Sequence, residues 1–215
     1  MRAKVAVVTV KGKPYYIIVK ELRRRGIPFI SLIPGIPVPA EIRLVITTEQ
    51  EKHKVNHAKT LLYDAETDPE IMGSQVVKIL QGKTAYETVV IGVDPGAVFG
   101  VAAIADGAVI ETENCFNPKQ VADRIKGILK AIELSSTAVT VKIGNGVPVY
   151  KKVIEKLDNA LPPQVILEIV GEAGTNRINH QAKRGRSIRH ILSAIRIASR
   201  TGRTYHRRIA IEQNS

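Results

Sequence analysis

Several residue types are scarce in this chain of 215 residues, and each scarcity excludes a class of protein. Cys115 is the only cysteine, so neither an intrachain disulfide nor a cysteine metal cluster can form, and a reducing compartment is expected. Tryptophan is absent and phenylalanine occurs three times, which argues against a platform of exposed rings for single-stranded bases, although six tyrosines limit this exclusion. Neither a signal-type leader nor an apolar run of about 18 residues is found. We therefore expect a soluble, globular, cytoplasmic protein without a membrane partner.

Acidic residues are also few, with 20 Asp and Glu against 32 Lys and Arg, a net charge of +12. Such a field concentrates polyanions, so nucleic acid, DNA or RNA, is the expected partner; a basic solvated surface is the alternative. Between Ala173 and Ile211 there is no acidic residue, whereas nine arginines and one lysine fall there. Arginine is the better fork for phosphate. The positions expected to contact the nucleic-acid backbone are Arg177, Lys183, Arg184, Arg186, Arg189, Arg196 and Arg200.

The spacing of four arginines predicts a basic stripe. Arg189, Arg196, Arg200 and Arg203 are separated by seven, four and three residues. They share one side of a helix if the final predicted helix, residues 187–200, continues as far as the last of them. A nucleic-acid backbone accounts for such a stripe better than a protein core does.

The pattern of apolar runs and turn residues divides the chain near residues 83–87 into two units. Residues 1–83 form a small α/β domain of unknown role, and residues 86–215 form a second α/β domain with a basic C-terminal segment. In the first, Gly12-Lys13 lacks the other residues of a phosphate loop and is interpreted as a turn. Its predicted strands are residues 4–10, 28–32 and 42–47, and its predicted helices are residues 15–25 and 68–80.

The pattern of the second unit predicts three strands in a meander followed by alternating helices and strands, in the order βββαβαβα. A mixed sheet flanked by helices is the expected architecture. The predicted strands are residues 88–94, 99–105, 108–113, 138–143 and 164–170, and the predicted helices are residues 119–134, 149–157 and 187–200.

One carboxylate stands out at the end of the first of these strands. An apolar run delivers Asp94 directly into the turn Pro95-Gly96, after which a second apolar run begins. Because an unpaired carboxylate is costly to bury, we expect a cation, a hydrogen-bond donor or a substrate to meet it there. The alternative is that Asp94 only caps the turn, since Asp before Pro-Gly is common in turns.

This element order, with an Asp ending the first strand, resembles the ribonuclease H-like fold. Within that fold the chain is similar to the RuvC and YqgF group of resolvase-like nucleases, over about residues 86–202, whereas residues 1–82 resemble no family that we identify. The likeness is carried by Ile91-Gly92-Val93-Asp94-Pro95-Gly96 with Gly100, by Val141-Lys142-Ile143-Gly144-Asn145-Gly146, by Val170-Gly171-Glu172-Ala173-Gly174-Thr175-Asn176-Arg177, and by His190-Ile191-Leu192-Ser193-Ala194-Ile195-Arg196-Ile197-Ala198.

The resemblance implies a site in which side chains from separate elements hold divalent metal at one edge of the sheet. Asp94 would be the principal ligand, Glu172 the second, and His190 would take the place of an Asp on the final helix. Mg²⁺ suits carboxylate oxygens, and Mn²⁺ accepts the imidazole nitrogen more readily. Two such ions can stabilise both the attacking water and the leaving oxygen of a phosphodiester. The alternatives are that Glu172 pairs with Arg177, and that His190 faces phosphate or solvent.

The sequence also departs from the group's pattern, which keeps two functions open. Lys142 and Ser193 stand where RuvC proteins carry acids. The first hypothesis is a metal-dependent nuclease acting on structured DNA or RNA, similar to Holliday junction resolvases. The alternative is a catalytically degenerate ribonuclease H-like protein that binds nucleic acid.

Two further implications come from resemblance alone. RuvC-type resolvases act as dimers on two-fold junctions, so the resemblance implies a homodimer. The Asp-Pro-Gly turn also resembles the first phosphate loop of the actin and sugar kinase superfamily. Those enzymes close two such domains around ATP, and this sequence shows one.

Overall fold

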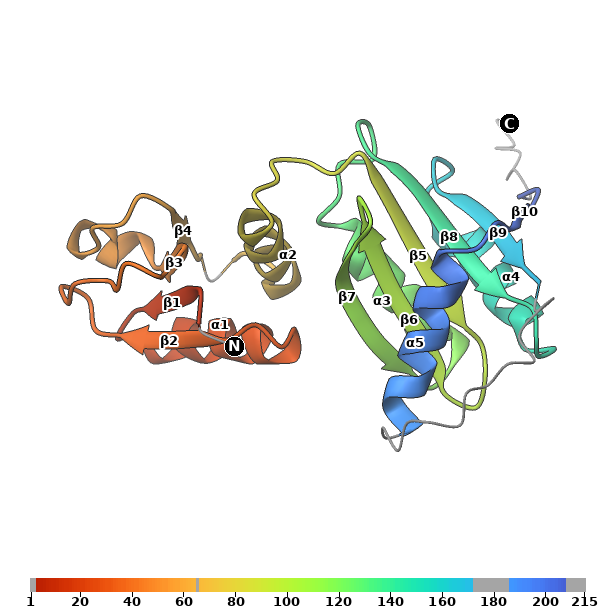
Figure 1. The fold of residues 1–215 in the computed structure, drawn as a ribbon, viewed down its shortest axis with the longest axis horizontal. Helices are drawn as coiled ribbons and strands as arrows, with labels where there is room; N and C mark the ends of the chain where they lie inside the picture. Colours follow the sequence, from red (N-terminus) through yellow and green to blue (C-terminus); the bar gives the residue numbers. More distant parts are fainter. Residues whose placement is uncertain (1–2, 65, 172–185, 208–215) are drawn as a thin grey trace, which may run out of the picture. The chain divides into compact units, whose positions relative to one another are not determined.

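The computed structural model describes residues 3–64, 66–171 and 186–207, and for residues 186 and 187 the backbone alone. The chain divides into two compact units, Met1–Ala85 and Tyr86–Ser215 (Figure 1). Each unit has its own sheet and its own hydrophobic core. Within the described ranges, every helix is too short or too polar to cross a bilayer.

The N-terminal unit is a parallel sheet with two helices on one face. The sheet order is β2-β1-β3-β4, and every neighbouring pair is parallel. All residues of the two central strands β1 and β3 are buried, as expected for a sheet covered on both faces. The strands are β1 (Val5–Val8), β2 (Phe29–Leu32), β3 (Leu44–Thr47) and β4 (Thr60–Leu62), and the helices are α1 (Gly12–Arg24) and α2 (Pro69–Leu80).

Two elements of this unit, β4 and η1, were not predicted from the sequence. Strand β4 has three residues, too few for a periodic pattern. The short 3₁₀ segment η1 (Glu49–Lys54) is held by side-chain contacts with distant residues. Helix α1 begins at Gly12, three residues earlier than predicted. Helix α2 begins as predicted, because the Asp68 carboxylate accepts a hydrogen bond from the Glu70 N–H at 3.0 Å.

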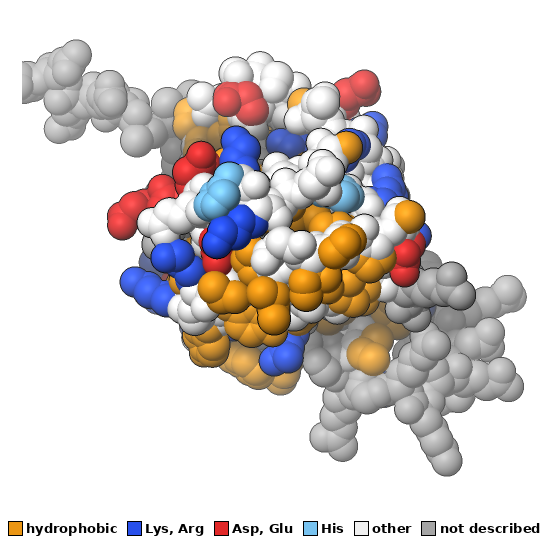
Figure 2. Space-filling model, turned by 90° about the vertical axis from the view of Figure 1, so that its left-hand side faces the viewer, with side chains coloured by type: hydrophobic (Ala, Val, Ile, Leu, Met, Phe, Trp, Pro, Cys, Tyr) orange, Lys and Arg blue, Asp and Glu red, His pale blue; other side chains and the backbone are white. Residues whose placement is uncertain are grey.

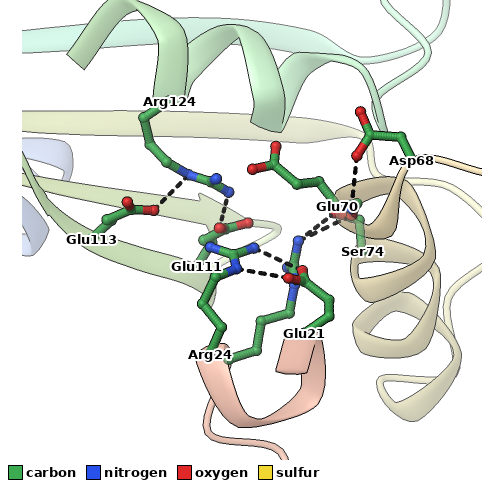
Figure 3. Close-up of polar contacts among 9 residues, drawn as sticks. Glu21, Arg24, Asp68, Glu70, Ser74, Glu111, Glu113 and Arg124 are labelled. Atoms are coloured by element: carbon green, nitrogen blue, oxygen red, sulfur yellow. Dashed lines mark hydrogen bonds and ion pairs between the residues drawn. The ribbon is translucent and has the colours of Figure 1, made fainter. Parts of the chain in front are cut away.

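A buried ion pair at the end of α1 (Figure 3) is linked to α2 by hydrogen bonds that Arg25 donates. The Glu21 carboxylate accepts hydrogen bonds from Arg24 and Arg25, and Arg25 also donates to the Glu70 carbonyl and the Ser74 hydroxyl. A Cβ atom at Gly73 would collide with these side chains, so glycine at that position makes room for the pair. These polar groups therefore fix how the two helices pack.

The C-terminal unit is the mixed α/β sheet that the sequence predicts. The sheet order is β10-β9-β8-β5-β6-β7. Strand β6 is antiparallel to β5 and β7, whereas β5, β8 and β9 are parallel to one another. This is the predicted order βββαβαβα, with one short strand added at an edge. The strands are β5 (Thr88–Asp94), β6 (Phe99–Ala105), β7 (Ala108–Cys115), β8 (Ala138–Gly144), β9 (Ile166–Val170) and β10 (Arg203–Thr204).

The helices of this unit cover opposite faces of the sheet. Helices α3 (Pro118–Leu129) and α4 (Tyr150–Ala160) lie over the face whose core includes Val89, Ile91 and Val93. Helix α5 (Arg186–Ala198) crosses the other face (Figure 1). On β7, Glu111 and Glu113 pair with Arg124 of α3 (Figure 3).

Three predicted helix ends in this unit are wrong. Helix α4 ends at Ala160, three residues later than predicted. Helix α3 stops at Leu129 and not at residue 134, because the Glu133 carbonyl and carboxylate accept hydrogen bonds from the following residues and form a turn into β8. Helix α5 stops at Ala198, and the chain then enters β10, which pairs with β9. Arg200 therefore lies beyond the helix and Arg203 lies on a strand, so the predicted stripe of four arginines on one helix is wrong at both positions.

Candidate functional site

Helix α5 lies unusually close to the sheet because two strand residues have no side chain. A Cβ atom at Gly92 of β5 would lie well inside 3.0 Å of the Ala194 carbonyl oxygen, and one at Gly100 of β6 equally close to the His190 carbonyl oxygen. Real Cβ atoms do not approach other atoms so closely. These glycines are therefore required for the backbone of α5 to rest on the strands.

This packing brings together two of the predicted site residues. Asp94 is the last residue of β5 and lies opposite Gly100 in the β5–β6 register. Since the His190 backbone lies over Gly100, its ring reaches the same edge, where Nδ1 is 3.5 Å from Asp94 Oδ2. The Asp94 and His190 side chains are 26% and 29% exposed. The contact is an ion pair when the imidazole is protonated, and both groups are accessible to a ligand.

The other predicted ligand and several predicted basic contacts cannot be placed. Glu172, Arg177, Lys183 and Arg184 lie outside the described residues, as does the side chain of Arg186. Strand β9 ends at Val170, whose carbonyl accepts a hydrogen bond from the Asn145 N–H at 3.1 Å. The carboxyl ends of β5, β8 and β9 thus meet at one edge of the sheet. In the described ranges no cluster of three or more His, Cys, Asp or Glu side chains is arranged to hold a metal.

Lys142 has a role that the sequence did not indicate. Its ammonium donates a hydrogen bond to the Arg200 carbonyl at 2.6 Å, just beyond the end of α5, and lies 3.6 Å from a carboxylate oxygen of Glu168. A cation at a helix C-terminus satisfies a carbonyl and opposes the negative end of the helix dipole. Lys142 therefore fastens the end of α5 to the middle of the sheet.

The basic residues near the C-terminus fall into two groups. Arg189 and Arg196 of α5 and Arg203 of β10 are exposed, Arg200 is half-buried, and none of the four has an acidic partner in the part of the chain that the structure describes. Arg207 differs, because its guanidinium donates to the Asp158 carboxylate and to carbonyls that end α4, including that of Leu161 at 2.7 Å. Arg207 is thus committed to the fold, and the first group remains open to phosphate.

The one thiol is not a candidate nucleophile. Burial, with a smaller contribution from the charge of Glu113, raises the pKa of Cys115 to about 11. A buried thiol with such a pKa stays protonated near neutral pH and is unreactive.

Comparison with known proteins gives one family-level similarity. A family model described as a response regulator receiver-like domain matches residues 4–77, most of the N-terminal unit. We did not predict this similarity from the sequence of the N-terminal unit. No match was found among curated proteins.

Two solved structures are similar to this chain with low TM-scores. The Marinitoga piezophila Argonaute in complex with a 5′ OH guide RNA has 13% identity and a TM-score of 0.30, over 79% of this chain and 39% of that chain. The same Argonaute with guide RNA and target DNA has 11% identity and a TM-score of 0.25, over 79% and 38%. The chain therefore spans about two fifths of these neighbours, and scores this low carry no argument about fold or function.

Proposed function

We propose that the C-terminal unit binds nucleic acid and cleaves its phosphodiester backbone with the help of a divalent metal, as in the RuvC and YqgF group that its sequence resembles. The observation that supports this proposal is the meeting of Asp94 and His190 at the carboxyl edge of the sheet. Both side chains are partly exposed there, and each is a candidate ligand on the sequence alone.

The chemistry of this pair suits a metal with mixed ligand preference. The described residues supply one carboxylate and one imidazole nitrogen, and Glu172 would be a third ligand. Mn²⁺ accepts such a set more readily than Mg²⁺, which prefers oxygen. When bound, the metal would activate water and stabilise the leaving oxygen of a phosphodiester. Asp94 would supply the negative charge that holds it.

The exposed arginines would hold the nucleic-acid backbone beside this site. Arg189 directly precedes His190 in the chain, and Arg196 lies seven residues further along α5, about 10 Å along the helix. Because both are exposed and lack acidic partners among the described residues, they are free to contact phosphates. Binding of this kind is independent of sequence and weakens steeply with salt.

Cleavage of labelled branched DNA and RNA with Mn²⁺ or Mg²⁺ tests the proposal. We expect Asp94→Asn to reduce cleavage about 100-fold or more, since it removes a charged metal ligand, while binding of the substrate changes little. Asp123→Asn on α3, an exposed acid on the opposite face of the sheet, is the matched control and should cleave normally. Unchanged cleavage by Asp94→Asn would overturn the proposed site.

A binding protein without catalysis is the second candidate, favoured by Lys142. Its ammonium stands where the resembled group has an acid, and it is occupied by the end of α5. This candidate predicts salt-dependent binding that persists in a metal chelator, together with no cleavage of any substrate. Titration of Mn²⁺ by calorimetry separates the two, because the degenerate protein should show no metal binding that depends on Asp94.

A further inference from the structure

The carboxyl edge of the N-terminal sheet contains a carboxylate that the proposed function does not use. In open parallel sheets, ligands bind beyond the carboxyl ends of the strands, at the point where the chain reverses its order across the sheet. Here that point lies between β1 and β3, because β2 and β3 flank β1 on opposite sides. Figure 2 shows the side of the molecule toward which the arrowhead of β2 points in Figure 1. Hydrophobic side chains gather on this side. Glu51 lies at this end, in η1, and is only 5% exposed.

Three donors from two strand ends converge on Glu51. The Thr9 hydroxyl, just beyond β1, and the Thr48 hydroxyl, just beyond β3, both donate to Oε2, the latter at 2.7 Å. The Val10 N–H donates to Oε1 at 3.0 Å. The Lys11 N–H in turn donates to the Thr9 oxygen at 3.1 Å, which leaves the Thr9 hydroxyl proton to point at the carboxylate.

The balance of these contacts keeps Glu51 ionised. Burial raises the pKa of this carboxyl, but the hydrogen bonds from Thr9, Val10 and Thr48, with the charge of Lys11, outweigh burial and hold the pKa below its ordinary value. The surroundings therefore favour a negative charge at this point, whichever group carries it.

We propose that Thr9, Val10 and Thr48 form an oxyanion-binding site and that Glu51 fills it as an internal ligand. Two hydroxyls and a backbone N–H directed at one negative group are the donors that bind carboxylate and phosphate oxygens. Glu51 reaches the site from η1, whereas the donors belong to the ends of β1 and β3. Loss of its side chain therefore leaves the donors in place for a free anion. In the natural chain the site is closed to free phosphate.

The test is Glu51→Ala in the full chain, with thermal unfolding followed in phosphate, acetate and chloride at one ionic strength. We expect phosphate or acetate, at about ten times its Kd, to raise the Tm of the variant by about 5–10 °C over chloride. The natural chain should show no such difference. In nuclear magnetic resonance spectra, the Val10 amide of the variant should shift with the anion and saturate. A response to acetate alone assigns a carboxylate ligand, and a response to phosphate assigns a phosphoryl-type ligand.

Two further variants separate a specific site from general effects. Glu49→Ala removes an exposed acid of the same segment and should gain no anion response. Glu51→Ala combined with Thr9→Val and Thr48→Val removes two donors and should lose the response. If Glu51→Ala is unfolded in chloride, the proposal expects acetate or phosphate to restore the fold. A variant that is folded yet indifferent to both anions, or unfolded and rescued by neither, overturns the proposal.

Discussion

The two units each place a carboxylate at the carboxyl edge of a sheet with parallel strands, yet they treat it differently. Glu51 of the N-terminal unit is buried and receives hydrogen bonds from Thr9, Thr48 and the Val10 N–H. Asp94 of the C-terminal unit is a quarter exposed and faces His190. One edge is therefore closed by the chain's own groups, and the other is accessible from solvent.

The difference shows what turns such an edge into a candidate site. A carboxylate there is not sufficient, because local donors can satisfy it completely, as at Glu51. The accessible edge has a partner, His190, that itself can bind metal or exchange a proton. Four measurements test this contrast, and we expect the first to show the greatest change.

Gly100→Val should cause the largest effect, because it moves His190 of α5 away from Asp94 at the accessible edge. The new side chain would occupy the space of the His190 backbone, and no rotamer relieves a clash that begins at Cβ. We expect a loss of about 3 kcal/mol or more in the free energy of unfolding, measured with urea, and loss of the proposed cleavage.

Gly171→Ala is the control for that prediction. A Cβ atom at this position would have no described residue within 4 Å, so the unfolding free energy of the variant should stay within about 0.5 kcal/mol of the natural chain. A Gly100→Val protein of natural stability would show that α5 does not depend on the close approach.

Thr48→Val should have the next largest effect, because it leaves a buried carboxylate short of one donor at the closed edge. We expect a loss of about 2 kcal/mol in urea unfolding. Thr47→Val is the matched control, since the Thr47 hydroxyl donates to the neutral Val8 carbonyl at 2.6 Å and should cost about 1 kcal/mol. Equal losses of unfolding free energy in the two variants would show that the hydrogen bond to the charged Glu51 contributes no more than the one to a neutral carbonyl.

The pH dependence of stability should reveal the contribution of Glu51 at the closed edge, with a smaller effect than the substitutions above. The pKa of Glu51 is lowered in the folded chain, so its contribution is present above the ordinary value of 4.5 and is lost as the pH falls through the folded pKa. The free energy of urea unfolding of the N-terminal unit, followed by its amide resonances, should decrease as the pH falls below about 4.5. Glu51→Gln should flatten this dependence, and an equally steep curve would assign it to other carboxylates.

Arg189→Ala should leave stability almost unchanged, because Arg189 is exposed and has no acidic partner among the described residues. We expect a change within about 0.5 kcal/mol in unfolding free energy, but a reduction of about one in the slope of log K against log salt for nucleic-acid binding. Lys152→Ala on α4, an exposed cation on the opposite face, is the matched control and should leave the slope unchanged.

The sequence predicted the C-terminal fold more completely than the site. Strands β5 and β6 were predicted at their observed bounds, because each is a continuous apolar run and Asp106-Gly107 marks the turn after β6. Both turn residues have positive φ, of 46° and 82°, as a tight hairpin requires. The association of Asp94 with His190 followed from the resemblance, and the structure then placed them in contact.

What remained hidden depends on contacts between distant residues. Thr9 and Glu51 are 42 residues apart, so no local pattern joins them. The capping role of Lys142 depends on where α5 ends, because its acceptor, the Arg200 carbonyl, lies 58 residues later in the chain. Similarly, Arg207 and Asp158 meet only after β10 has paired with β9. In each case the sequence shows a charged residue, and only the tertiary fold shows its partner.

The close seating of α5 on Gly92 and Gly100 also fixes the helix along its own axis. An α-helix that advanced by one residue would turn by about 100° and would bring a branched side chain, such as Ile191 or Ile195, toward a strand backbone with no space for it. A shift of α5 by one residue is therefore excluded. The alignment of His190 with Asp94 thus depends on the absence of side chains at Gly92 and Gly100, which are remote in sequence from α5.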